Sequence, residues 1–231
     1  MEKPPSPHVS LATERITPPS PGRSRGGRPS RQAVVQLEQR ILDVAAELFA
    51  KQGYAATSME QVAEACQAGK DTIYRRYPSK GALFGAVMAH FRAPVLDELE
   101  RCLSNPGSAQ EQLRRYARAL LDINLRPQLV ALNRVALAEA LPAKGVQMPT
   151  GENDPILQQL TQLVAQAQAS GDLIEADTAF IAEQLLYATA IRPLVSTMLG
   201  QSAFADITSQ QRYFDQAWRL FMRGAGQSFE D

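Results

Sequence analysis

The 231-residue sequence is poor in the side chains on which most catalytic and metal sites depend. It contains two histidines and two cysteines, and it lacks a nucleophile motif, a metal-ligand motif and a phosphate-binding loop. Catalysis would have to rest on scattered carboxylates without a recognisable spacing. We therefore expect no enzymatic activity, no cofactor and no metal.

Long apolar runs are also missing. No run approaches the ~18 residues of a membrane span, and the N-terminus lacks the apolar core of a signal peptide. Cys66 and Cys102 fall on expected helix faces that also carry Met, Val or Leu, which favours two buried thiols over a disulfide. These absences predict a cytoplasmic protein with no membrane partner. The 45% apolar and 21% charged residues are ordinary for a soluble globular protein.

Net charge is absent as well, but the charges are unevenly distributed. Residues 1–80 hold 12 Lys+Arg and 8 Asp+Glu, whereas the remainder holds 12 and 16. The two parts therefore carry +4 and −4. This asymmetry indicates that only the N-terminal part meets a polyanion.

Residues 57–84 form the most informative stretch. Thr57 and Glu60 predict a capping box at the start of a short helix, whose buried stripe is Met59, Val62, Ala63 and Cys66. A second short helix is expected from Gly69 onward, with Ile73 and Tyr77 packed inward. Its outer face carries Lys70, Thr72, Tyr74, Arg75 and Arg76. Two short helices with a polar, basic second member are typical of a helix-turn-helix.

A preceding helix completes a three-helix module. Its apolar face follows the helical period and contains Leu37, Ile41, Val44, Ala45, Leu48 and Phe49. Gly53 follows the last turn, where a left-handed residue is expected.

The segments AAELFAKQGYAATSMEQVA and KDTIYRRYPSKGALF closely resemble the DNA-binding domain of TetR-type (tetracycline-repressor-like) transcriptional regulators. The resemblance covers roughly residues 36–88. It departs from the family pattern at Gln67 and Gly69, where the family commonly has Gly in the turn and Ser at the helix start. Because Gln tolerates positive φ poorly, we expect a reshaped turn in which Gly69 takes the unusual dihedral angles.

The resemblance implies an all-α protein of two parts, and the composition adds an N-terminal arm. We expect a disordered, Pro-rich basic arm at 1–33, a helix-turn-helix DNA-binding domain at 34–80, and a larger helical ligand-binding and dimerisation domain at 81–231. Within the arm, GRSRGGRPSR resembles the core of an AT-hook. Arg28 either enters a minor groove, contacts phosphates only, or belongs to a solubilising tail.

The expected DNA contacts follow from residue chemistry. Phosphate contacts are expected from Tyr74, Lys80 and the helix start at Thr57 and Ser58. Base contacts are expected from Lys70, Thr72, Arg75 and Arg76, because Arg pairs with guanine through two hydrogen bonds. For both arginines, a phosphate contact or a solvated position is the alternative.

Further helices are expected from just after Ser79 and near 108–125, 128–141, 155–170, 177–199 and 208–224, with a loop at 142–155. Pro94 is expected to kink or end the first of these, and Asp154 and Pro155 are expected to begin the fourth. The helix at 177–199 is apolar almost all round and therefore needs cover from two directions. We expect it to form a four-helix dimer interface with the last helix through Leu185, Val195, Phe214, Trp218 and Phe221. The alternative is that both helices complete the core of a monomer.

A dimer predicts an inverted repeat in double-stranded DNA. The resemblance further implies an unidentified small-molecule effector that moves the helix following the recognition helix and releases the DNA. The pocket candidates are Phe91, Tyr116, Leu120, Leu137, Tyr187 and Ile191, each of which could instead be ordinary core. Arg192 could meet an acidic ligand, or serve in an ion pair or at the surface.

Two non-enzymatic alternatives remain open. An architectural protein could bend DNA through its arm without sensing a ligand, and a helical dimer could act on another protein. The sequence does not distinguish repression from activation, but repression is commoner in the family.

Overall fold

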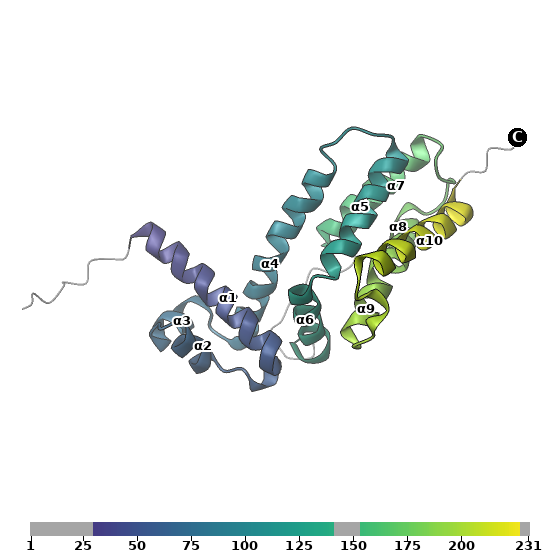
Figure 1. Ribbon diagram of the computed structural model, residues 1–231. Helices are drawn as coiled ribbons and strands as arrows, with labels where there is room; N and C mark the ends of the chain where they lie inside the picture. The colour runs from purple at the N-terminus through teal and green to yellow at the C-terminus, as the bar shows by residue number, and fades with distance from the viewer. Residues whose placement is uncertain (1–29, 141–152, 227–231) are drawn as a thin grey trace, which may run out of the picture.

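The computed structural model describes residues 30–140 and 153–226, and this part of the chain is helical without a strand. A head of three helices comprises α1 (Arg31–Ala56), α2 (Met59–Ala65) and α3 (Lys70–Arg76). The long helix α4 (Lys80–Cys102) runs from the head into a larger helical body (Figure 1). The all-α, two-part fold class expected from the sequence is confirmed.

The body consists of the remaining helices. They are α5 (Ala109–Asn124), α6 (Pro127–Val135), α7 (Pro155–Ala169), α8 (Thr178–Leu186), α9 (Arg192–Met198) and α10 (Ile207–Ala225). A π-helical turn, Ala136–Ala140, extends α6, and a short 3-10 turn, Ser202–Phe204, precedes α10. All the helices expected in the body are present within a few residues of their expected ends.

The helix expected at 177–199 is present but is not uniform. A π-helical turn, Tyr187–Ile191, joins α8 to α9. This turn lies directly ahead of Pro193, whose missing N–H and bulky ring disturb the regular hydrogen-bond ladder. In contrast, α4 continues through Pro94 to Cys102 and does not end there.

Local signals explain three helix starts, two of which agree with the sequence expectation. Asp154 accepts a hydrogen bond from the backbone N–H of Ile156 at the start of α7, as expected. Gly69 is the N-cap of α3 and supplies no side-chain hydrogen bond. Ser30 caps α1, so the first helix begins three residues earlier than expected and includes Arg31. The remainder of the expected arm, with Arg28, lies outside the described residues, as does most of the loop expected at 142–155.

The capping box of α2 lies one residue later than expected. Ser58, not Thr57, accepts the hydrogen bond from the backbone N–H of Gln61, and the Gln61 side chain accepts from the backbone N–H of Ser58. The sequence TSMEQ contains both S/T-x-x-E/Q patterns, and packing selects between them.

The turn between α2 and α3 is not reshaped. Gln67 itself takes the left-handed conformation with φ of 53°, whereas Gly69 has an ordinary φ of −65°. The expectation that Gly69 carries the unusual angles is therefore wrong. Gln67 keeps the turn at a cost of roughly 1 kcal/mol. Gly53 has φ of 86° and marks a kink before the last residues of α1, as expected for a left-handed position.

Two hydrophobic clusters divide the molecule, and α4 contributes to both. The head cluster contains Leu83, Phe84 and Val87 from the start of α4, together with residues of α6 such as Leu132. The body cluster takes Val95 and Leu99 from its second half. The first turns of α4 therefore complete the core of the three-helix head.

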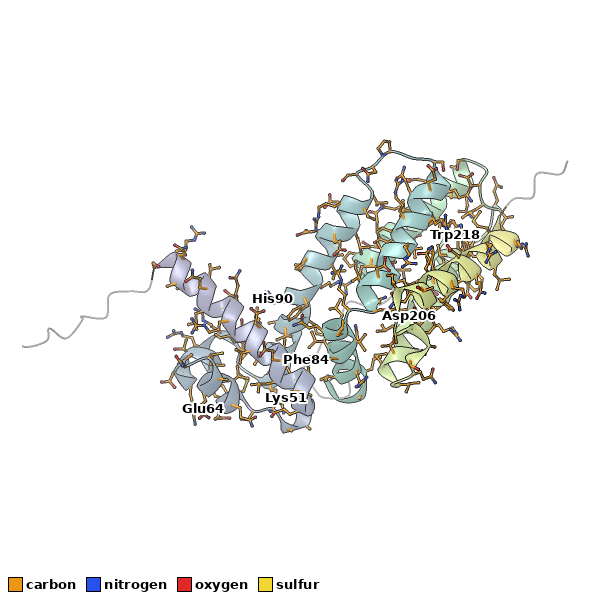
Figure 2. The ribbon with its side chains drawn as sticks, in the orientation of Figure 1. Lys51, Glu64, Phe84, His90, Asp206 and Trp218 are labelled. Carbon is orange, nitrogen blue, oxygen red and sulfur yellow. The ribbon has the colours of Figure 1, made fainter. Side chains whose placement is uncertain are left out.

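Aromatic rings hold the junction of head and α4. Phe84 meets Phe49 edge-on at 5.1 Å and Tyr54 edge-on at 5.6 Å between ring centroids. Figure 2 shows Phe84 where the base of α4 meets α1. Farther along α4, the His90 ring nitrogen lies 3.1 Å from the Asp43 carboxylate of α1. These contacts make α4 one connection between the two parts, beside α6, which also packs against α1.

Candidate functional site

The outer face of α3 is open to solvent. Ile73 is fully buried and Tyr77, just after the helix, is 7% exposed, so both pack inward as predicted. Lys70 and Arg75 are exposed, Tyr74 is 43% exposed, and Thr72 is half-buried. The helix thus presents a cation, a phenol and a guanidinium to an approaching partner, as a recognition helix does.

Tyr74 is held by the preceding helix. Its hydroxyl donates to the Glu60 carboxylate at 3.1 Å. A backbone N–H of Glu60, then this hydroxyl, lower the pKa of the Glu60 carboxyl, and the same hydrogen bond raises the pKa of Tyr74. Glu60 therefore positions Tyr74 rather than capping α2. Sequence reasoning missed this role, because the two residues lie on different helices.

The two neighbouring arginines are not equivalent. Arg76 points back to α1, with Nη1 3.7 Å from the Glu38 carboxylate and only 22% of its side chain exposed. Arg75 is exposed and makes no ion pair among the described residues. Of the two, Arg75 is the one whose guanidinium is open to solvent.

Two predicted DNA contacts have structural roles instead. Thr57 is 1% exposed, and its hydroxyl donates to the Gly53 carbonyl at 2.7 Å. Lys80 donates from Nζ to the carbonyls of Tyr54 and Thr57 at 2.7 and 2.9 Å. It thereby neutralises the carbonyl end of α1. Ser58 remains half-exposed at the start of α2, where it can still meet a phosphate.

A cavity of about 360 Å³ lies against α4 between α5, α6 and the start of α7. Among the described residues, its wall is apolar except for Arg92, Asn124 and Asn133. The apolar lining comprises Gly85, Met88, Ala89, Phe91, Val95, Ile123, Leu129 and Ile156. The cavity thus lies where α4 passes from the head cluster to the body cluster. Its volume is at the small end of the ~300–1,000 Å³ range for drug-sized ligands.

Of the six pocket candidates, only Phe91 lines this cavity. Tyr116 and Leu120 are 1% and 2% exposed in the body core, and the Tyr116 hydroxyl donates to the Ile156 carbonyl at 3.3 Å. Burial raises the pKa of Tyr116. Leu137 and Tyr187 are 57% and 59% exposed, and Ile191 is half-buried away from the cavity lining. Sequence reasoning missed Arg92 and both asparagines.

A second hollow, of about 620 Å³, is a wide apolar groove over α8 and α10. Phe180 is 59% exposed, Leu220 74% and Ile174 37%, and all three line the groove with Phe221. Large apolar side chains at such exposure mark an interaction surface. We call this surface, lined by Ile174, Phe180, Gln184, Tyr213, Leu220 and Phe221, the α8–α10 face.

The expected interface residues divide between this face and the core. Leu185, Phe214 and Trp218 are 0%, 1% and 6% exposed and belong to the body cluster, so they serve the protomer's own interior. Figure 2 shows Trp218 on α10. Phe221 lines the groove, whereas Val195 is 40% exposed on α9 outside its lining.

Arg192 lies over aromatic rings and not in the α4 cavity. Its guanidinium carbon is 5.2 Å from the centroid of Tyr213 and 5.7 Å from that of Phe204. The side chain is exposed at the rim of the groove, in agreement with the surface alternative. Within the described residues, no cluster of three potential metal ligands occurs, and no helix is long and apolar enough to cross a membrane.

Two family profiles match the chain. The profile for bacterial regulatory proteins of the tetR family matches residues 41–87, and that for the C-terminal domain of AefR-like transcriptional repressors matches residues 111–224. A transcriptional repressor of Mycobacterium tuberculosis is 36% identical over 97 residues, which are 38% of this chain and 48% of the relative. The chain thus spans about half the length of the curated relatives it matches first.

Solved structures share the fold over most of their length. A TetR-family regulator from Mesorhizobium loti superposes with a TM-score of 0.69 at 22% identity, covering 86% of this chain and 100% of the other. A flavonoid-responsive regulator superposes with a TM-score of 0.61 at 25% identity, covering 83% and 98%.

Proposed function

The chain belongs to the TetR family of DNA-binding transcriptional regulators, which are not enzymes, and we propose that it is a homodimeric, ligand-released repressor. In this proposal the dimer binds an inverted repeat in double-stranded DNA. A small molecule in the α4 cavity separates the heads. The protein acts in the cytoplasm, without a cofactor and without a membrane partner.

DNA reading is assigned to α3. Lys70, Thr72 and Arg75 meet base edges, with Arg75 as the expected partner of a guanine. Tyr74 and Ser58 meet phosphates, which fix the position of α3 without reading sequence. The observation that carries this assignment is the outward set of Lys70, Tyr74 and Arg75 on a helix whose Ile73 is fully buried.

Dimerisation is assigned to the α8–α10 face. Phe180 and Leu220 project from neighbouring helices at 59% and 74% exposure, and a copy of the same surface would cover them. A two-fold interface is self-complementary, so α8 and α10 of each protomer would form a four-helix contact. The two α3 helices would then lie about one DNA turn apart, ~34–36 Å or a little more, which favours an inverted repeat.

Ligand release is assigned to α4. One stretch of this helix packs into the head through Phe84 and Val87, and the next borders the cavity through Met88, Phe91 and Arg92. A ligand that binds the separated state of the heads more tightly than the DNA-bound state shifts the equilibrium toward release. We propose repression and not activation because the M. tuberculosis relative and the C-terminal family profile are both described as repressors.

Selection of bound sequences from a random DNA pool tests the proposal. Wild-type protein should enrich an inverted repeat, and Arg75→Ala should lose discrimination at one base-pair position in each half-site. Recovery of asymmetric sequences, or of DNA without a common motif, would count against a symmetric sequence-reading dimer. It would favour the architectural alternative.

A further inference from the structure

The walls of the α4 cavity limit the chemistry of its ligand. One aromatic ring, Phe91, and several aliphatic side chains provide most of the lining, and Arg92 is the only ionisable residue among the lining residues that the structure describes. A lone guanidinium in such a wall would usually indicate an anionic ligand, because Arg binds carboxylates through two hydrogen bonds.

Arg92, however, is already neutralised. Its Nη2 donates to Oδ1 of Asp154, and the two side chains are only 21% and 26% exposed. The same Asp154 oxygen accepts from the backbone N–H of Ile156, which fixes the carboxylate at the start of α7. The Nε of Arg92 is buried and has no hydrogen-bond partner among the described residues.

A ligand carboxylate would therefore meet an Arg92 guanidinium that is already paired with Asp154, and it would lie beside the Asp154 carboxylate. It would have to displace Asp154 or remain unpaired, and burial of an unpaired charge is far costlier than burial of a neutral oxygen. A carbonyl or phenol oxygen loses less on desolvation and does not repel Asp154.

The two amides add neutral polar groups to the same wall. Asn133 donates from Nδ2 to the Leu129 carbonyl at 2.9 Å, which leaves its carbonyl oxygen available as an acceptor. No hydrogen bond of the Asn124 side chain is found within residues 30–140 and 153–226. Together the amides can donate to one ligand oxygen and accept from a ligand hydroxyl.

We propose that the α4 cavity selects a neutral aromatic molecule bearing carbonyl or phenol oxygens, and that the Arg92–Asp154 pair excludes its carboxylate counterparts. This inference rests on the proposed ligand-responsive function. It adds the chemical class of the effector, which the ion pair between Arg92 of α4 and Asp154 at the start of α7 determines.

Two probes of nearly equal shape separate the classes. Methyl 6-hydroxy-2-naphthoate is neutral, whereas the 6-hydroxy-2-naphthoate ion carries a carboxylate at pH 7. Titration of each into the full-length protein without DNA, followed by probe fluorescence, gives two affinities. The ester should bind at least about tenfold more tightly than the ion.

Asp154→Asn tests the ion pair itself. Asn is as good an N-cap as Asp, so α7 keeps its start while Arg92 regains an unpaired charge. The ion should gain about tenfold in affinity relative to the ester. Asp43→Asn is the matched control, since it removes a carboxylate facing His90 of α4 outside the cavity. It should leave the ratio of the two affinities unchanged.

Gly85→Leu locates the site. Gly85 lines the cavity, and a Cβ built there meets no atom within 4 Å, so a larger side chain would fill the space. Both probes should then lose affinity.

Three results would overturn the inference. They are ion binding as tight as ester binding in the wild type, no ester binding at about 1 mM, and an unchanged ratio in Asp154→Asn. Because no DNA is present, these results do not depend on operator binding. A failure of ligand-driven DNA release would instead contradict the proposed function while leaving the affinity ratio as measured.

Discussion

The head and the body of this protein both have an apolar core, but they differ in how many large apolar side chains they leave exposed. In the head, α1 to α3 bury their apolar stripes within the protomer, and the exposed face of α3 is polar. In the body, α8 and α10 bury Leu185 and Phe214 inside yet leave Phe180 and Leu220 exposed. The head is complete as a single copy, whereas the body has an apolar face left to cover.

The largest effect on stability is expected from removing a buried ring where α4 packs into the head cluster. Phe84→Ala should destabilise the head by about 3–5 kcal/mol, because it removes a fully buried ring that contacts Phe49 and Tyr54. Hydrogen exchange should then show lost protection in α1–α3. Phe214→Ala removes a ring of equal size from the body cluster, and its exchange changes should stay within α5–α10. Equal loss in both parts for either variant would show that the clusters do not act separately.

The second effect concerns the α8–α10 face. Leu220→Asp should weaken self-association by at least about 2 kcal/mol, because a charge would be buried in an apolar contact. Ile207→Asp is the matched control, since Ile207 is 68% exposed on the same helix but does not line the groove. Sedimentation velocity across a concentration series measures both. Similar association of the two variants would contradict the assigned interface.

A smaller effect distinguishes the two arginines of α3. Arg75→Ala should reduce the free energy of DNA binding by about 1–3 kcal/mol and relax specificity at one base-pair position. Arg76→Ala should reduce the free energy of DNA binding by less than about 1 kcal/mol, because Arg76 points toward Glu38 of α1. The loss of this partly exposed ion pair should also change the stability of the protein little. Fluorescence anisotropy with the selected operator and single-base variants gives both values. A larger loss for Arg76 would mean that the pair opens on binding.

The smallest effect lies in the turn of the helix-turn-helix. Gln67→Gly should stabilise the protein by up to about 1 kcal/mol, because Gly adopts positive φ without the Cβ penalty. As a control, Ala165→Gly, which puts glycine at an exposed position in the middle of α7, should destabilise the protein by roughly 0.5–1 kcal/mol. Urea unfolding measures both, and a loss of stability in Gln67→Gly would argue against the left-handed turn.

The sequence predicted the helices well because their signals are local. The buried positions of α1, the start of α7 at Asp154 and the inward Ile73 all follow from spacing within a few residues. Choices between neighbouring local signals were less secure. Ser58 rather than Thr57 caps α2, since the packing of Thr57 under Gly53 decides the register.

The pocket and the interface were not predictable in the same way. Arg92 and Asp154 are 62 residues apart, and no spacing rule brings them together. The all-round apolar pattern of 177–199 predicts cover from two directions, and the body cluster supplies the one inside the protomer. The pattern could not tell that Leu185 faces the protomer's core while Phe180 faces outward, because both choices bury apolar area.

The proposed function requires α4 to carry the effect of ligand binding in the cavity to the spacing of the two heads in a dimer. Spin labels at Glu64→Cys report this spacing directly, since Glu64 is exposed on α2 (Figure 2). Cys102→Ala removes the partly exposed native thiol, and burial, which raises the pKa of the Cys66 thiol, protects the other.

Pulsed dipolar spectroscopy then measures the distance between the labels of the two protomers. We expect one defined distance in the free dimer and a longer distance when methyl 6-hydroxy-2-naphthoate is bound. Absence of a defined distance between protomers, or a distance that stays the same with saturating ester, would contradict the proposed function.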